Sequence, residues 1–229
     1  MSTSIELRIE SVTHRIGDRT VLDGVCLHLS ERRIGLIGLN GSGKSTLARL
    51  LNGLVVPTEG RVLVDGLDTA RHAAAVRRRV GFVFTDPDAQ IVMPTAGEDV
   101  AFSLRRRGFS RAELRAQAER TLERFGLAGH ADSPAHLLSG GEKQLLALAS
   151  VLVTEPALVI CDEPTTLLDL RNARRVADLI AGLDPAVLLV THHLDQLAGF
   201  DRVIVMHEGR VAADDSPAAA IAAYRRLAG

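Results

Sequence analysis

The sequence lacks an excess of charge of either sign. Its 229 residues contain 27 Lys and Arg against 28 Asp and Glu, a formal net charge of -1. Nonspecific binding to nucleic acid or to anionic lipid depends on a basic surface. We therefore expect no nucleic acid partner, and any association with a membrane should depend on a protein partner.

Long hydrophobic runs are also missing. The longest candidate, residues 145–161, is interrupted by Glu155 and Pro156, whereas a membrane-spanning helix needs roughly 20 apolar residues. The first ten residues, MSTSIELRIE, contain no secretory hydrophobic segment. These absences predict a cytoplasmic protein, and 46% hydrophobic residues predict a globular core.

Cysteine is scarce, with Cys26 and Cys161 as its two occurrences. They lie far apart in apolar runs without the paired spacing of zinc or redox motifs. We expect both to be small buried core residues. The eight histidines are scattered and form no H-x-x-x-H pattern, although His192 and His193 are adjacent.

A phosphate-binding loop is the strongest motif present. The run GLNGSGKST fills every required position of G-x-x-x-x-G-K-[ST], and an apolar strand-like run precedes it while a helical run ending at Gly53 follows. The alternative is a surface glycine turn followed by a lysine by chance, which would not be expected to have a strand before it and a helix after it. The motif predicts nucleotide contacts from Gly38, Asn40, Gly41, Ser42, Gly43, Lys44, Ser45 and Thr46.

Within this loop each residue type has a physical role. Glycines allow successive N–H groups to converge on phosphate oxygens at a helix N-terminus. Lys44 would neutralise the β- and γ-phosphates, and the Ser45 hydroxyl would ligate Mg²⁺. The sequence therefore predicts ATP and Mg²⁺ as ligands.

An acidic pair follows a buried run in ALVICDEP. Ligands bind at the carboxyl ends of strands in parallel sheets. Asp162 is expected to hold Mg²⁺, and Glu163 to accept a proton from an attacking water. A solvated acidic turn is the alternative, and such pairs are common.

The order of the short apolar runs predicts an α/β fold. Two alternating runs separated by Gly17-Asp18 suggest an N-terminal antiparallel sheet, and later runs lie between helical stretches, as in a parallel sheet. From Glu98 to about Val153 helices dominate. One begins with a Ser110–Glu113 capping box and ends at Gly126.

A second candidate anion site lies about a hundred residues after the first. In LLSGGEKQ a serine hydroxyl and glycine N–H groups stand at the start of an apolar helix, at Ser139, Gly140 and Gly141. One ATP does not need two such cradles from one subunit.

With these motifs in order, the chain resembles the ATP-binding subunits of ABC transporters over nearly its whole length. The resemblance implies a RecA-like parallel-sheet core, an N-terminal antiparallel β-subdomain and a helical insert, in one domain of residues 1–229. The core would comprise 1–85 and 156–229, and the Q-loop and signature would lie in 86–155. The signature of one subunit (Ser139, Gly140, Gly141, Glu142) would close on ATP held by the other, in a homodimer or a heterodimer with a related ATPase.

The same resemblance assigns further roles. His192 matches the histidine that contacts the γ-phosphate, and Asp169 matches the D-loop aspartate. Ile16 occupies the place of the aromatic residue that usually stacks on adenine. Base stacking is therefore expected to be weaker, or to be supplied otherwise by Arg15 or His14.

Two positions near the active site also depart from the family pattern. Thr85 replaces the usual glutamine, and Gln90 is the expected substitute for contact with Mg²⁺ and the attacking water. Glu142 replaces the usual glutamine of the signature, a change expected to leave the serine and glycine donors intact.

Residues 85–102, TDPDAQIVMPTAGEDVAF, resemble the ATPases of energy-coupling factor (ECF) importers, most closely those for biotin. This implies a transmembrane coupling protein and a substrate-binding membrane protein as partners, at the cytoplasmic face of the membrane. A cobalt or nickel importer, an exporter, and a soluble ABC ATPase acting on DNA or ribosomes are the alternatives. The segment could also be a simple linker.

Overall fold

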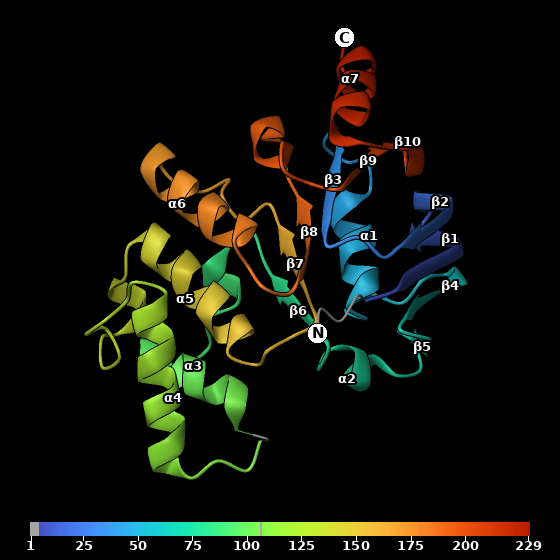
Figure 1. Ribbon diagram of the computed structural model, residues 1–229. Coiled ribbons are helices and arrows are strands. Elements are labelled where there is room, and N and C mark those ends of the chain that lie inside the picture. The colour runs from blue at the N-terminus through green and yellow to red at the C-terminus, as the bar shows by residue number, and fades with distance from the viewer. Residues whose placement is uncertain (1–4, 106) are drawn as a thin grey trace. The chain divides into compact units, whose positions relative to one another are not determined.

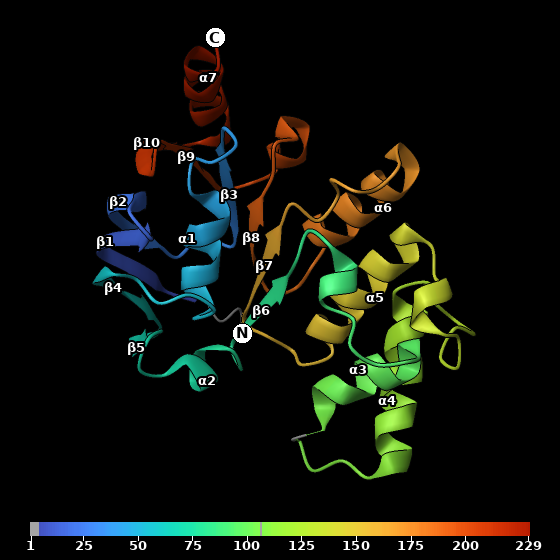
Figure 2. The ribbon, with the colours of Figure 1, turned by 180° about the vertical axis from the view of Figure 1, so that it is seen from behind.

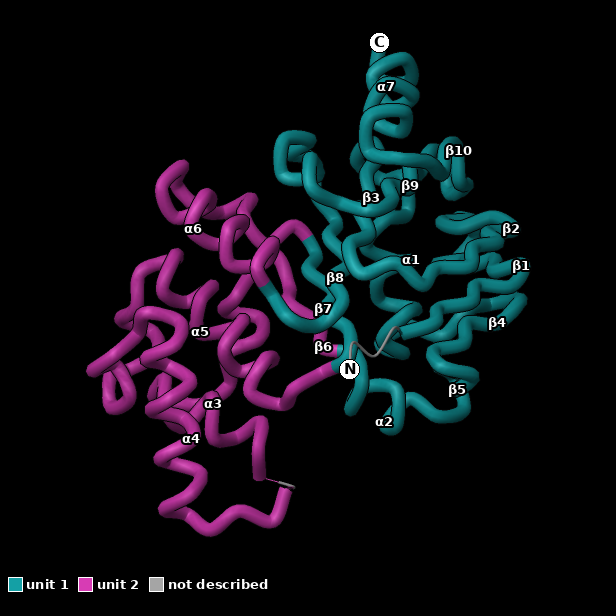
Figure 3. The backbone as a smooth tube through the Cα atoms, viewed as in Figure 1, with its two compact units in different colours: residues 1–80, 157–162, 183–229 teal, residues 81–156, 163–182 magenta. Residues whose placement is uncertain are grey.

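The computed structural model describes residues 5–105 and 107–229. They form two compact units, one of residues 1–80, 157–162 and 183–229 and the other of residues 81–156 and 163–182 (Figure 3). No described helix has the length and apolar content needed to cross a membrane.

Unit 1 begins with an antiparallel sheet of strand order β2-β1-β4-β5. Its strands are β1 (Leu7–Ile16), β2 (Arg19–Leu29), β4 (Glu59–Val64) and β5 (Leu67–Asp68). The expected turn between β1 and β2 is present, and Gly17 has the positive φ of 57° that such turns favour.

One sequence prediction fails in this sheet. Cys26 is exposed, not buried, whereas Cys161 is buried as expected. In β2, Val25 and Leu27 point into the core on either side of Cys26, so the alternation of a half-buried strand places the thiol on the opposite face.

A second, predominantly parallel sheet contributes strands to unit 1 in the order β10-β9-β3-β8-β7. β3 (Arg33–Gly38), β7 (Leu158–Asp162), β8 (Ala186–Val190) and β9 (Arg202–His207) run parallel, and β10 (Arg210–Asp215) is antiparallel to β9. Every residue of β7 and β8 is buried. Such continuous burial is typical of strands covered on both faces.

Helix α1 (Lys44–Leu51) contacts strands of both sheets, and α7 (Pro217–Leu227) contacts β9 and β10 (Figures 1 and 2). Unit 1 also contains α2 (Ala73–Val76) and the short 3-10 helix η3 (Leu194–Leu197). α1 has its apolar residues, including Leu47 and Leu51, fully buried. This packing fixes the loop that precedes α1.

Unit 2 is mostly helical, as the sequence predicts. The chain enters it within β6 (Val80–Val83), and then forms η1 (Pro87–Ala89), α3 (Ala96–Leu104), α4 (Arg111–Arg124), η2 (Ala135–Leu137) and α5 (Gly140–Leu152). The expected Ser110–Glu113 capping box is present, and Gly126 follows α4 with a φ of 71°.

The boundaries of the units differ from the ranges expected for core and insert. Residues 163–182, including α6 (Leu170–Ala181), group with unit 2 because α6 packs on α5. The chain also passes from unit 1 to unit 2 after Val80, earlier than the expected boundary at residue 85. The segment after the acidic pair therefore belongs with the helices.

Candidate nucleotide-binding site

The loop between β3 and α1 has a backbone that requires its glycines. Gly41 and Gly43 have φ values of 77° and 99°, in the region that residues with a side chain rarely adopt. A Cβ on Gly38 would lie 2.2 Å from the carbonyl oxygen of Met206. Two required positions, Gly38 and Gly43, and the additional Gly41 are thus fixed by backbone conformation or by close packing.

Lys44, the first residue of α1, is folded over this loop. Its Nζ donates hydrogen bonds to the carbonyl oxygens of Gly38 and Leu39, both at 2.9 Å, and the side chain is 7% exposed. The ammonium is therefore held beside the loop amides, where its charge adds to that of the helix N-terminus.

Ser45 and Asp162 form a polar pair below the loop. Ser45 Oγ donates to Asp162 Oδ1 at 2.9 Å, and Arg49 Nη2 lies 3.9 Å from Asp162 Oδ2. Asp162 ends β7 and is 1% exposed. A hydroxyl and a carboxylate are oxygen donors of the kind that Mg²⁺ prefers, so this pair fits the predicted magnesium ligands.

His192 follows β8, as expected for a residue at the carboxyl edge of the sheet. Its ring packs against that of His193 with centroids 4.1 Å apart. The His193 N–H donates to Thr191 Oγ1 at 3.0 Å. This bond shapes the turn after β8, and it gives His193 a local structural role.

In unit 2, Glu163 has a strained backbone with a φ of 53°. Its Oε2 accepts a hydrogen bond from Thr166 Oγ1 at 2.7 Å. Non-glycine residues with positive φ often occur at functional sites, and the bond orients the carboxylate proposed to act as a base.

Asp169 caps helix α6. Its Oδ1 accepts from the Asn172 N–H at 2.9 Å, and its Oδ2 accepts from Asn172 Nδ2 at 2.8 Å. These bonds lower the pKa of Asp169. A Cβ on Gly141 would lie 2.5 Å from Asn172 Cγ, so Asn172 joins the D-loop to the signature. Asn172 is not among the residues predicted from the sequence, although the Asp-x-x-Asn spacing at the start of α6 is a signal for such a cap.

The signature begins α5 with a capping box. The Ser139 N–H and Oγ–H donate to Glu142 Oε2 at 2.8 and 2.7 Å. In this conformation the Ser139 hydroxyl therefore donates to Glu142, and the expectation that the serine and glycine donors remain available to a nucleotide stays a prediction. The Ser139 bonds lower the pKa of Glu142.

Gln90 is anchored to backbone within unit 2. Its Oε1 accepts from the Phe84 N–H at 3.1 Å, and its Nε2 donates to the Ala147 carbonyl at 3.2 Å. The amide oxygen predicted to contact Mg²⁺ thus holds residues 84–90 against α5. The oxygen has a second lone pair, so this bond does not by itself prevent contact with a metal.

Comparison with known proteins identifies the family. The family model described as ABC transporter matches residues 22–166. The chain is 50% identical to the biotin transport ATP-binding protein BioM of Rhizobium etli, over 98% of this chain and 100% of that protein. The chain belongs to the ABC transporter ATP-binding family.

Two further similarities support the same family. The chain is 44% identical to the energy-coupling factor transporter ATP-binding protein EcfA1 of Symbiobacterium thermophilum, over 91% of this chain and 75% of that protein. The structure of cbiO1 from Clostridium perfringens, part of the ABC transporter complex cbiONQ, matches with a TM-score of 0.83 and 32% identity, over 96% of this chain and 92% of that one. The predicted fold class is thereby confirmed, and the ABC ATPases to which this chain belongs hydrolyse ATP.

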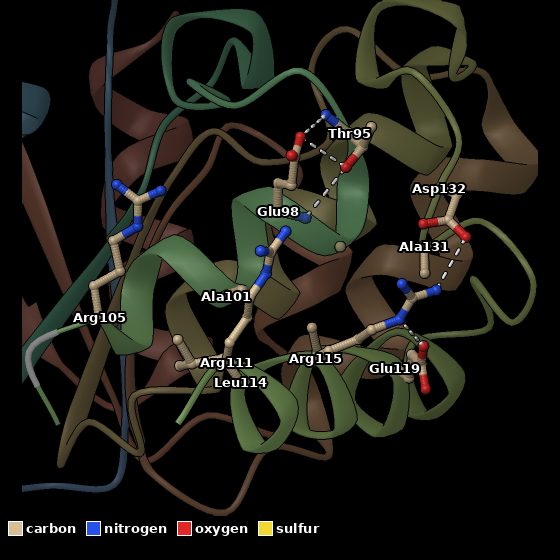
Figure 4. Close-up of a pocket in the computed structure, with 12 residues that line it drawn as sticks. Thr95, Glu98, Ala101, Arg105, Arg111, Leu114, Arg115, Glu119, Ala131 and Asp132 are labelled. Atoms are coloured by element: carbon tan, nitrogen blue, oxygen red, sulfur yellow. Dashed lines mark hydrogen bonds and ion pairs between the residues drawn. The ribbon is translucent and has the colours of Figure 1, made fainter. Parts of the chain in front are cut away.

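A separate cavity of about 490 Å³ lies in unit 2 of this ABC ATPase, between α3, α4 and residues 131–132 (Figure 4). Arg115 there donates to Glu119 at 2.9 Å and to Asp132 at 3.2 Å. The Glu98 carboxylate accepts a hydrogen bond from the Thr95 N–H in the capping box at the start of α3. The cavity contains none of the phosphate-loop residues, so it is not the nucleotide site.

Proposed function

We propose that the chain is the ATP-hydrolysing energy-coupling subunit of an ECF-type importer, with biotin as the favoured cargo. The observation that carries the ATPase mechanism is the Ser45–Asp162 hydrogen bond, of 2.9 Å, directly after the phosphate loop. The similarity to BioM and to EcfA1 over nearly the full chain supports the importer type and the cargo.

Each residue of the nucleotide site has a separate role in this proposal. The loop amides and Lys44 bind the β- and γ-phosphates, and Ser45 and Asp162 hold Mg²⁺. Bound Mg²⁺ supplies positive charge that stabilises the phosphate oxygens. Glu163 accepts the proton of the attacking water, and His192 donates to the γ-phosphate.

The signature serves a second subunit in this proposal. Ser139 and Gly141 complete the site of a partner copy or of a related ATPase, so ATP closes the dimer and hydrolysis releases it. The subunit acts at the cytoplasmic face of the membrane, bound to a transmembrane coupling protein and a substrate-binding membrane protein. The named complex of the cbiO1 relative supports such partners.

Glu163→Gln and Lys44→Ala test the ATPase mechanism. We expect Glu163→Gln to bind ATP, form a stable dimer and hydrolyse very slowly, whereas Lys44→Ala should lose nucleotide affinity. Glu155→Gln is a matched control, because Glu155 also has a positive φ, of 51°, but lies before β7. Normal turnover by Glu163→Gln would contradict the general-base assignment.

Purification of tagged Glu163→Gln protein from membranes in mild detergent tests the cellular function. Mass spectrometry should detect two membrane proteins and bound biotin. Detection of cobalt or nickel instead of biotin would support an importer but would contradict biotin as its cargo. Ribosomal proteins or nucleic acid would contradict the importer proposal.

A further inference from the structure

A hollow of about 400 Å³ lies beside the phosphate loop in unit 1. Its walls come from the start of β2, from the phosphate loop and from the turn between β9 and β10. The residues that line it are Arg19, Thr20, Val21, Leu39, Asn40, Gly41, Ser42, His207, Glu208 and Gly209. A ligand whose phosphates occupy the loop has adjacent space here for its remaining part, and the volume is within the usual range of small-molecule sites.

Ser42 supplies a polar group that points to a ligand in this place. Its side chain is 4% exposed, and its Oγ has no hydrogen-bond partner among the described residues. Buried hydroxyls are normally satisfied. An unsatisfied one that lines a hollow beside a phosphate loop is expected to bond to the nucleotide.

The residues expected from the sequence to contact the base do not line this hollow. Arg15 Nη2 is 3.7 Å from Glu59 Oε1, and neither Arg15 nor His14 is among the lining residues. Ile16 is 62% exposed and is not among them either. The lining contains no Phe, Tyr or Trp, so another planar group must face the base.

Arg19 brings a planar cation close to the loop. A Cβ built on Gly41 would lie 3.5 Å from Arg19 Nη2, so the guanidinium lies over the phosphate loop. Arg19 forms no ion pair with an acidic side chain within residues 5–105 and 107–229. His207, the last residue of β9, is the aromatic heterocycle of the lining, but its side chain has no hydrogen bond to the phosphate loop among the residues that the structure describes.

We propose that Arg19 binds the adenine of ATP, with its guanidinium plane stacked on the base. This proposal rests on the proposed nucleotide-binding function and replaces the earlier expectation for Arg15 or His14. A guanidinium stacks well on aromatic faces because it is planar and weakly hydrated, and arginine planes stack on nucleic acid bases in the same way. The residue thereby takes the role that an aromatic side chain at position 16 would have.

Calorimetric titration with two probes, ATP and inorganic tripolyphosphate, each with magnesium, tests the proposal. Arg19→Ala should weaken ATP binding roughly 2- to 30-fold, the range of cation–π contacts from exposed to desolvated sites. Binding of tripolyphosphate, which has no base, should weaken less than binding of ATP, because it loses the charge of Arg19 but no stacking contact. Arg19→Lys keeps the charge but loses the plane, so it should recover only part of the ATP affinity lost in Arg19→Ala, while Arg15→Ala should bind both probes like the wild type.

Other outcomes would overturn the assignment. Equal weakening of both probes in Arg19→Ala, with recovery in Arg19→Lys, would make Arg19 a phosphate ligand. Unchanged ATP binding in both variants would remove Arg19 from the site. A wild-type protein that binds neither probe would instead contradict the proposed nucleotide-binding function itself.

Discussion

Two serines of the phosphate loop allow a stability test with a built-in control. Ser45 Oγ donates to the carboxylate of Asp162 at 2.9 Å, while Ser42 Oγ is buried without a partner among the described residues. A hydrogen bond to a charged group contributes about 1.5–3 kcal/mol. Alanine at position 45, within α1, recovers up to about 0.5 kcal/mol of helix propensity.

Ser45→Ala should therefore lower the free energy of unfolding by about 1–2.5 kcal/mol. For a chain of this size that is a fall in Tm of about 2–10 °C. Ser42→Ala removes an unsatisfied buried hydroxyl, so stability should be unchanged or rise by up to about 1–3 kcal/mol. The same substitution is thus expected to lower the free energy of unfolding at position 45 but not at position 42.

Urea unfolding followed by circular dichroism, without nucleotide or magnesium, measures both effects, and an unchanged m-value would confirm that each substitution changed stability alone. Equal destabilisation by the two substitutions would refute the reasoning. It would mean that Ser42 is bonded in solution, or that the Ser45–Asp162 bond contributes nothing.

Three further predictions concern other parts of the chain. The Ser139 bonds lower the pKa of Glu142 in the folded protein. Ionised Glu142 therefore stabilises the folded state above the ordinary glutamate pKa of about 4.3, and this stabilisation is lost as the pH falls through the lower folded pKa. The difference in free energy of unfolding between wild type and Glu142→Gln, measured by urea unfolding, should therefore shrink toward acid pH. Cys26 is exposed, whereas burial and the nearby Asp162 charge raise the pKa of Cys161 to about 12, so Ellman's reagent should titrate one thiol in native protein and two in denaturant. Gln90→Ala removes two hydrogen bonds to backbone in unit 2, so it should lower the free energy of unfolding by about 1–3 kcal/mol and speed hydrogen exchange at the Phe84 amide. It should also reduce ATP hydrolysis more than Thr85→Ala does. Equal, small effects on hydrolysis would favour the linker interpretation of this segment.

Local features of the fold were predictable because they depend on neighbouring residues. The glycines of the phosphate loop, the Ser110–Glu113 capping box and the stop at Gly126 all follow from short-range conformational preferences. The exposed position of Cys26 was also within reach, since its neighbours Val25 and Leu27 alternate with it. The error came from treating an apolar run as a uniformly buried strand.

Other features depend on contacts between residues far apart in the sequence. The grouping of α6 with the helical unit depends on packing against α5, and Gln90 is fixed by Ala147, 57 residues later. Arg19, rather than Arg15, reaches the phosphate loop because the hairpin reverses between them. No local pattern encodes these distances.

Two side chains of the phosphate-binding site are already hydrogen-bonded within the protein. Lys44 Nζ bonds to two loop carbonyls and Ser45 Oγ bonds to Asp162. Lys44 Nζ has three N–H donors and the Ser45 oxygen keeps its lone pairs, so phosphate and metal can bind while these internal bonds persist. ATP and free polyphosphate would use these contacts alike. The Arg19 guanidinium lines the space beside the loop, so we expect discrimination between nucleotides and free polyphosphate to arise from this hollow.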